Sequence, residues 1–84
     1  MARFDVEVRV MPRPSLLDPQ GQAVEHALTA LGFSQTSDVR VGRAMTFHLE
    51  SPDRKSAEKA AEAMCQRLLA NPVTEDFVVS VKAA

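Results

Sequence analysis

The chain has 84 residues and a formal net charge of −1, with acids and bases mixed along its whole length. A chain of this size forms one domain, residues 1–84, and leaves much of its surface unburied, so we expect it to oligomerise or to dock to a partner. Such a small net charge gives the surface no strong electrostatic attraction for nucleic acid or anionic lipid. Neither class of partner is therefore expected.

The chain contains a single cysteine, Cys65, so it can form neither an internal disulfide nor a two-cysteine metal or redox motif. Charged and apolar residues alternate just after Met1, and no run of about 18 apolar residues occurs anywhere. These features predict a cytoplasmic protein that is neither exported nor membrane-spanning.

The segment Arg3–Met11 has apolar residues at even positions and mostly charged ones at odd positions, the period of a half-buried strand. After a loop at Pro12–Leu17, Asp18 is placed as a helix N-cap and Pro19 as the first helical residue. Gly32 can end this helix in the left-handed conformation. The helix is expected to bury Val24, Ala27, Leu28 and Leu31.

The next segment, Thr36–Glu50, keeps its apolar residues at odd positions on both sides of Gly42 and Arg43. A two-residue hairpin there would pair residues of opposite parity and break the apolar face. One long strand, bent or bulged at Gly42, preserves the face, and so would a three-residue turn over residues 42–44. We favour the long strand.

Ser51-Pro52-Asp53 predicts the start of a second helix, with Ser51 as its cap, Pro52 as its first residue and Asp53 in its first turn. Asn71-Pro72 ends this helix, because the residue before proline disfavours helical geometry. A last strand is expected over Asp76–Lys82, with Phe77, Val79 and Val81 facing inward. The second helix is expected to bury Ala57, Ala60, Ala61, Met64 and Leu68.

This order of elements predicts an α+β fold, a two-layer sandwich with two helices on one face of a mainly antiparallel three- (or four-) stranded sheet, related to the ferredoxin-like plan. The hairpin alternative would supply the fourth strand. The opposite sheet face, with Arg40, Thr46 and His48, is expected to be open for pairing with another subunit.

No group of residues predicts a catalytic, cofactor or metal site. Gly42-Arg43 lacks the glycine-rich cradle and the lysine of a nucleotide-binding loop. His26 is expected on a solvated helix face, and His48 has no oriented partner that the sequence identifies. Cys65 is expected to pack as a small hydrophobe, and Asp18 is better explained as a helix cap than as a catalytic acid.

Three junctions are specific in residue type: Asp18-Pro19-Gln20-Gly21, Val39-Arg40-Val41-Gly42-Arg43 and Leu68-Leu69-Ala70-Asn71-Pro72-Val73. Together with Leu31-Gly32-Phe33 and Glu75-Asp76-Phe77, in this order and at this spacing, they resemble the PurS family. This family is the small subunit of bacterial and archaeal phosphoribosylformylglycinamidine (FGAM) synthase. The resemblance covers nearly the whole chain, with Arg43 where lysine is frequent and Thr74 where an aliphatic residue is common.

The resemblance implies a non-catalytic subunit in the fourth step of de novo purine synthesis. In that step formylglycinamide ribonucleotide, glutamine and ATP give formylglycinamidine ribonucleotide, glutamate, ADP and phosphate. It also implies two partners, a glutaminase subunit that releases ammonia and a synthetase subunit that uses ATP and Mg²⁺. The PurS-type subunit, as a homodimer or a dimer of dimers, would bridge them, assist ammonia transfer and bind no cofactor itself.

Partner contacts are expected at the loop Pro14–Gly21, the bend Arg40–Arg43 and the junction Asn71–Glu75. The candidate interface residues are Asp18, Gln20, Gly21, Arg40, Gly42, Arg43, Asn71, Pro72 and Glu75. Arg40 and Arg43 are expected to dock to acidic or phosphate-bearing surfaces. Two alternatives share the same small sandwich plan, an ACT-type regulatory module that binds a small molecule and a small dimeric enzyme of the ferredoxin-like kind.

Overall fold

The fold is described by a computed structural model of residues 1–84. Its strands are β1 (Ala2–Pro12), β2 (Arg43–Ser51) and β3 (Glu75–Ala83), and its helices are α1 (Pro19–Ala30) and α2 (Arg54–Met64), the latter continued by a π-helical turn at Cys65–Leu69. The strands form one sheet in the order β2-β1-β3, and both neighbouring pairs are antiparallel. The predicted α+β class, the two helices and the three-stranded antiparallel sheet are confirmed.

The core lies on one face of the central strand, as the alternation predicted. Phe4, Val6, Val8 and Val10 are all buried, and the register places Val6 between Phe47 of β2 and Val81 of β3. Ala57 and Ala61 of α2 are completely buried against this face. Alanines at these positions let the helix lie close to the sheet, since larger side chains would hold it away.

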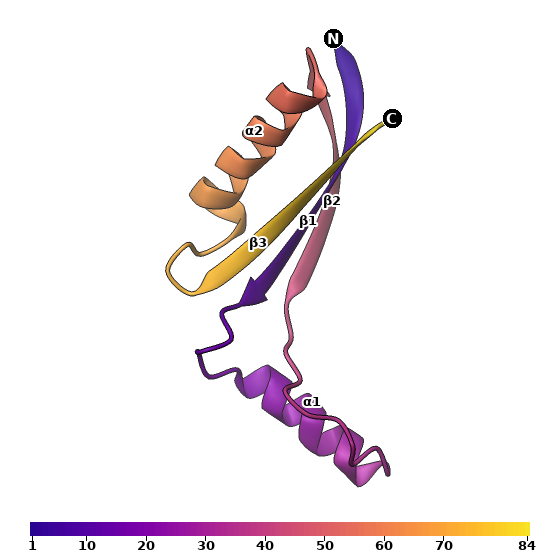
Figure 1. Cartoon of the computed structure of the whole chain (residues 1–84), viewed down its shortest axis with the longest axis vertical. Helices are drawn as coiled ribbons and strands as arrows, with labels where there is room; N and C mark the ends of the chain where they lie inside the picture. Colours follow the sequence, from indigo (N-terminus) through magenta and orange to yellow (C-terminus); the bar gives the residue numbers. More distant parts are fainter.

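Within one chain α2 forms the helical layer and contacts all three strands, whereas α1 extends beyond the end of the sheet (Figure 1). α1 begins and ends as predicted, with Asp18 as N-cap, Pro19 as its first residue and Gly32 at a φ of +100°. Its apolar stripe is not buried, however, and Leu31 is 74% exposed, because no other element of the chain covers it.

The long strand predicted over Thr36–Glu50 is wrong, because β2 begins only at Arg43. Arg43 already pairs with Val10, and β1 ends two residues later at Pro12, so almost no strand remains for the preceding residues to join. Their backbone instead meets α1, and the amides of Val39 and Val41 donate to the side chains of Glu25 and Asp18. The alternative of a hairpin turn at residues 42–44 is also wrong, since the sheet has no fourth strand.

The predicted start of the second helix is displaced. Asp53, not Ser51, is the N-cap, and its Oδ1 accepts from the Ser56 amide at 2.7 Å, while Ser51 closes β2. The predicted burial of Leu68 is also wrong, since that side chain is 81% exposed. The π-helical turn, closed by a hydrogen bond from the Ala70 amide to the Cys65 carbonyl, rotates this segment and buries Cys65 instead.

Candidate interaction surfaces

The three sequence junctions meet at one end of the sheet, where β1 ends and where β2 and β3 begin. A hollow of about 400 Å³ lies there, beside the first two junctions and Glu75, which follows the third. It is lined by Pro12, Asp18, Gln20, Val41, Gly42, Arg43 and Glu75. Five of the nine predicted interface residues therefore surround one depression, which we call the junction hollow.

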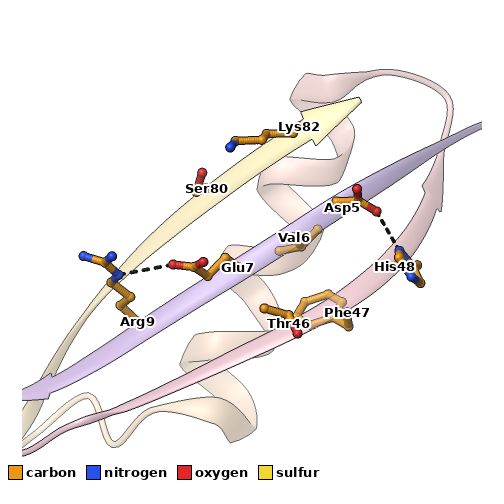
Figure 2. A pocket seen from close by; sticks show the side chains of 9 residues that line it. All are labelled: Asp5, Val6, Glu7, Arg9, Thr46, Phe47, His48, Ser80 and Lys82. Atoms are coloured by element: carbon orange, nitrogen blue, oxygen red, sulfur yellow. Dashed lines mark hydrogen bonds and ion pairs between the residues drawn. The ribbon is translucent and has the colours of Figure 1, made fainter. Parts of the chain in front are cut away.

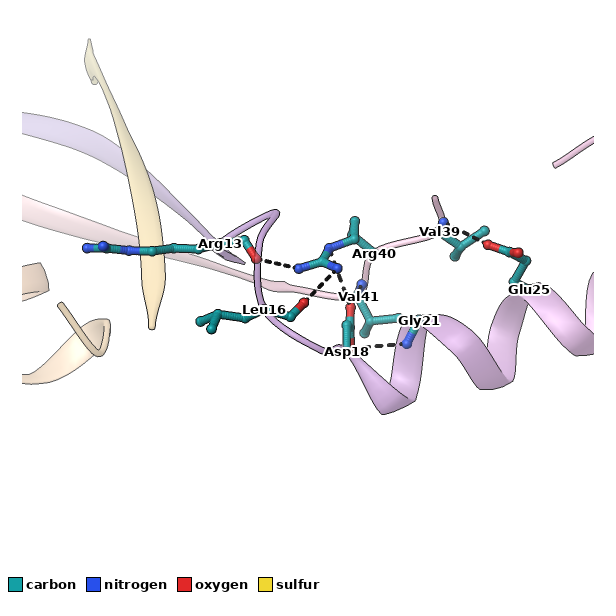
Figure 3. Close-up of polar contacts among 8 residues, drawn as sticks. All are labelled: Arg13, Leu16, Asp18, Gly21, Glu25, Val39, Arg40 and Val41. Atoms are coloured by element: carbon teal, nitrogen blue, oxygen red, sulfur yellow. Dashed lines mark hydrogen bonds and ion pairs between the residues drawn. The ribbon is translucent and has the colours of Figure 1, made fainter. Parts of the chain in front are cut away.

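Asp18 joins two of these junctions (Figure 3). Its Oδ1 accepts from the Gly21 amide at 3.1 Å, as expected of a helix cap, and its Oδ2 accepts from the Val41 amide at 2.9 Å. The Val41 and Gly21 amides stabilise the charged form, so they hold the pKa of Asp18 below its ordinary value of 3.8. A buried carboxylate with these partners fixes the position of α1 relative to the segment that leads into β2.

Arg40 does not lie on the open sheet face, where the sequence placed it. Its guanidinium turns back toward the loop before α1 and donates to the carbonyl oxygens of Arg13 and Leu16, and Nε lies 4.0 Å from Asp18 (Figure 3). This difference follows from the loss of the long strand, because a residue outside the ladder does not alternate with it. Arg40 therefore holds the loop in place from within the chain.

Arg43 and Glu75 connect the second junction to the third. Arg43 Nη1 lies 2.6 Å from Glu75 Oε2, Nη2 lies 3.0 Å from Oε1, and Nη2 also donates to the Leu69 carbonyl. This two-point contact raises the pKa of Arg43 and lowers that of Glu75, which also accepts from the Asn71 amide. Much of the donor capacity of this arginine is thus used inside the chain.

Arg13 is a connecting residue that the sequence reasoning did not single out. Its side chain donates to the Pro72 carbonyl and lies 3.5 Å from Asp76, and its amide donates to the Thr74 carbonyl at 3.0 Å. Its own carbonyl accepts from Arg40. The only signal in the sequence is its position between two prolines, which indicates a loop but not a partner.

Two predicted interface residues, Gly21 and Gly42, must be glycine because another part of the backbone passes too close to leave room for a Cβ atom. A Cβ at Gly21 would clash with the Val39 carbonyl, and one at Gly42 would clash with the Val10 carbonyl and the Met11 sulfur. Gly42 therefore marks a point where two backbone segments nearly touch, rather than a bulge within a strand. Asn71, in turn, shapes its junction by accepting from the Val73 amide.

The predicted interface residues fall into two groups by exposure. Asp18 and Gly21 are buried, and Arg40 and Glu75 are partly buried, so these four shape the surface. The exposed members can meet a partner directly. They are Gln20, Gly42, Arg43, Asn71 and Pro72.

The sheet face opposite α2 is polar and open (Figure 2). His48 Nδ1 lies 2.6 Å from Asp5 Oδ1, a partner in the register that the sequence reasoning missed, and Arg9 pairs with Glu7 at 3.2 Å. Both members of the His48 pair are more than half exposed, and Ser80 lies on the other side of β1 from His48. His48 and Asp5 thus form a hydrogen-bonded pair on the surface. His26, on α1, is exposed as predicted.

Cys65 is completely buried, which confirms its expected packing as a small hydrophobe, and burial raises the pKa of its thiol. No group of three or more His, Cys, Asp and Glu side chains lies close enough together to hold a metal ion. Neither helix has the length and apolar character needed to cross a membrane.

Known proteins of one family are similar to this chain along nearly its whole length. Residues 5–83 match the family described as "PurS: Phosphoribosylformylglycinamidine (FGAM) synthase". The FGAM synthase subunit PurS of Bacillus subtilis is 40% identical over 79 residues, which are 94% of this chain and 93% of that protein.

Two solved structures extend this similarity to the fold. PurS of Thermus thermophilus gives a TM-score of 0.85 at 35% identity, with 98% of each chain covered. A chain in the structure of PurLQS from Thermotoga maritima gives 0.89 at 26% identity, with 98% of this chain and 100% of that chain covered. These matches favour the PurS interpretation over the ACT-type alternative.

Proposed function

This chain belongs to the PurS family and is a subunit of phosphoribosylformylglycinamidine synthase in purine biosynthesis, and from this premise we propose that it bridges a glutaminase subunit and a synthetase subunit without catalysing a step itself. The observation that carries the proposal is the meeting of three family junctions at one end of the sheet, where two of them line one hollow and Arg43 and Glu75 connect the third. A surface assembled from three separate segments suits docking.

The chemistry of the complex explains why such a subunit is needed. Ammonia released by a glutaminase is mostly protonated in neutral water, and ammonium is not a nucleophile. The two active sites must therefore be held together while water is excluded between them. A small, rigid subunit can set that geometry without reacting, and ATP and Mg²⁺ would be used on the synthetase subunit.

The contacts inside the junction hollow refine the expected roles of the two arginines. Arg40 and Arg43 are bonded within the chain, so we assign them chiefly to positioning the three loops. Direct contact with partner subunits falls to the exposed members, with Gln20 and Pro72 at opposite junctions. Pre-formed loops bind with a smaller entropic cost than loops that must first become ordered.

The proposal places this protein in the cytoplasm, where the reaction's other subunits and its nucleotide substrates would be found. It also includes self-association, as a dimer or a dimer of dimers. The large apolar side chains left exposed on α1 and at the π-helical turn support this part, since single chains rarely expose so many together.

Complex formation tests the proposal. The chain would be mixed with separately purified glutaminase and synthetase subunits, and the mass of the product measured by size-exclusion chromatography with light scattering. We expect a ternary complex that requires this chain and is weakened by Gln20→Arg. The matched control, Glu58→Arg on the exposed side of α2, should bind normally. A glutaminase–synthetase complex of equal stability without this chain would contradict the bridging role.

A further inference from the structure

Arg13 is held from two sides, although it belongs to none of the three junctions. Its carbonyl oxygen accepts from Arg40 of the second junction (Figure 3), and the Leu16 amide donates to the same oxygen at 3.0 Å. On the other side its guanidinium donates to the Pro72 carbonyl of the third junction and lies 3.5 Å from Asp76. One residue thus connects the loop before α1 to the second and third junctions.

Two further links close a ring of the three junctions. The first and second are joined where the Asp18 carboxylate accepts from the Val41 amide at 2.9 Å. The second and third are joined where Arg43 donates to the Leu69 carbonyl at 2.6 Å. Arg13 connects the third junction back to the loop that leads into the first. Each junction is therefore held by both of the others.

The arginine links of this ring lie at the surface, where a single one is weak. The Arg13 side chain is 45% exposed and the Arg43 side chain is 49% exposed. An exposed ion pair stabilises a loop only slightly, because water and salt screen it. In a closed ring, however, opening one junction removes two links at once. The junctions should therefore open and become ordered together, as one cooperative unit.

We propose that Arg13 couples the three junctions, so that ordering of one junction favours ordering of the others. Arg13 is a positioning residue in this arrangement, because it acts through the loops that it holds. A partner bound at one junction keeps that junction ordered, so a second partner that binds at another loses less conformational entropy. This consequence for partners rests on the bridging role proposed above, whereas the coupling within the chain does not.

Hydrogen exchange on this chain alone tests the coupling. Arg40→Gln removes two donors to the loop before α1 and changes no contact of the third junction directly. Exchange would be read at the Val73 and Thr74 amides, which donate to Asn71 at the end of the third junction. We expect Arg40→Gln to speed both by about threefold or more, the size of coupling found within one hydrogen-bond network.

Arg13→Gln supplies the second half of a double-mutant cycle. This variant loses the ion pair to Asp76 and the guanidinium contact to Pro72, while the backbone amide of residue 13 still donates to the Thr74 carbonyl. In this background Arg40→Gln should change the two exchange rates by less than about 1.5-fold. Arg13→Lys keeps a charge and a donor but not the planar fork, so the effect of Arg40→Gln should return in part.

The matched control is Arg9→Gln, which removes an exposed arginine of β1 that pairs with Glu7. It should leave the effect of Arg40→Gln on the third junction unchanged. The amides of Val6 and Val8, in the centre of the sheet, report whether each variant stays folded.

Binding measurements test the consequence for partners. The dissociation constant of the glutaminase subunit would be measured with and without a saturating synthetase subunit, and the ratio of the two values is the coupling factor. We expect a factor of about five or more for the unmodified chain and a lower one for Arg13→Gln. Each partner alone should bind Arg13→Gln within about twofold of its affinity for the unmodified chain.

Two exchange results would overturn the coupling. They are third-junction amides that do not respond to Arg40→Gln, and a response that is as large in the Arg13→Gln background as without it. Weaker binding of one partner alone to Arg13→Gln, with an unchanged coupling factor, would make Arg13 a direct contact and overturn its positioning role. A chain that passes the exchange test but forms no ternary complex keeps the coupling and loses only the bridging role.

Discussion

The Val41 amide donates to the Asp18 carboxylate at 2.9 Å, although the two residues are 23 positions apart. Through this contact a helix cap also becomes a tertiary link, because the same carboxylate accepts from Gly21 at the start of α1. The position of α1 therefore depends in part on one buried acid, and Glu25 supplies a second link through the Val39 amide.

Replacing Asp18 by alanine should lower the thermal midpoint and loosen the attachment of α1 to the segment before β2, leaving only the Glu25–Val39 hydrogen bond. The reason is that the Val41 and Gly21 amides both lose their acceptor, and buried unpaired amides are unfavourable. Hydrogen exchange read at these two amides should show faster exchange, with the rest of the sheet unchanged. The conservative variant Asp18→Asn, which keeps a side-chain oxygen as a cap, should retain more of the stability. Equal protection of both amides in Asp18→Ala would refute the link.

The same carboxylate gives a pH dependence with a defined sign. The pKa of Asp18 in the folded chain is lower than its ordinary value of 3.8, so its contribution to stability is complete above that value. As pH falls below about 4 and through the lowered pKa, protonation removes this contribution. Glu75 acts in the same direction from its ordinary value of 4.5. Denaturant titrations from pH 7 to pH 2 should show a smaller acid-dependent loss in Asp18→Asn, and an identical slope would contradict this.

The Arg43–Glu75 pair should stabilise the fold fully only with the arginine at position 43 and the glutamate at position 75. Arg43→Glu alone places two acids together and should lower stability, and the double exchange Arg43→Glu with Glu75→Arg should restore only part of it. Recovery is incomplete because Arg43 also donates to Leu69, and Glu75 also accepts from Asn71. Reversal of the exposed Arg9–Glu7 pair serves as control and should change the free energy of unfolding by no more than about 0.5 kcal/mol. Full recovery in the double exchange would show that the charge pair alone matters.

Gly21 should tolerate no side chain. Gly21→Ala would push a methyl group into the Val39 carbonyl, which costs about 1–3 kcal/mol when neighbours must move. Gln22→Ala, at the next and exposed position, removes a side chain without any clash and is the control. Chemical denaturation of both variants measures the difference, and an unchanged Gly21→Ala would mean that the loop is not held against α1.

The stability of the fold should also depend on the small side-chain volume of Ala61, which packs between α2 and the sheet. Ala61→Leu places three additional carbons in a filled space and should destabilise the fold by about 1–3 kcal/mol. Glu58→Leu adds a similar apolar side chain at an exposed position on the same helix and should have little effect. Comparable losses in the two variants would contradict the close packing of α2.

The sequence predicted the elements that depend on local pattern and core burial. The alternation in β1 identified its buried face, and Asp18-Pro19 located the start of α1, because both signals act within a few residues. The segment before Arg43 kept the strand parity, yet β1 ends only two residues beyond Val10, at Pro12, and offers almost nothing for it to pair with. The alternation in a segment shows that it could form a strand, but it does not show whether a neighbouring strand is available to pair with it.

The candidate site shows the same division. Gly21, Gly42 and the three junctions were singled out by residue type, and the structure brings the junctions together at one end of the sheet, where the first two line one hollow. The internal use of Arg40 and Arg43 and the connecting role of Arg13 were not foreseen. These contacts join residues 22 to 63 positions apart. A guanidinium in a sequence looks the same whether it binds a carbonyl of its own chain or another protein.

Glutamine-dependent synthesis tests the central claim most directly. Formylglycinamidine ribonucleotide formation would be measured with separate glutaminase and synthetase subunits, with and without this chain, using either glutamine or ammonium as the nitrogen source. A bridging subunit should be required for the glutamine-dependent reaction and should leave the ammonia-dependent reaction of the synthetase unchanged. A glutamine-dependent rate that is the same without this chain would contradict the account.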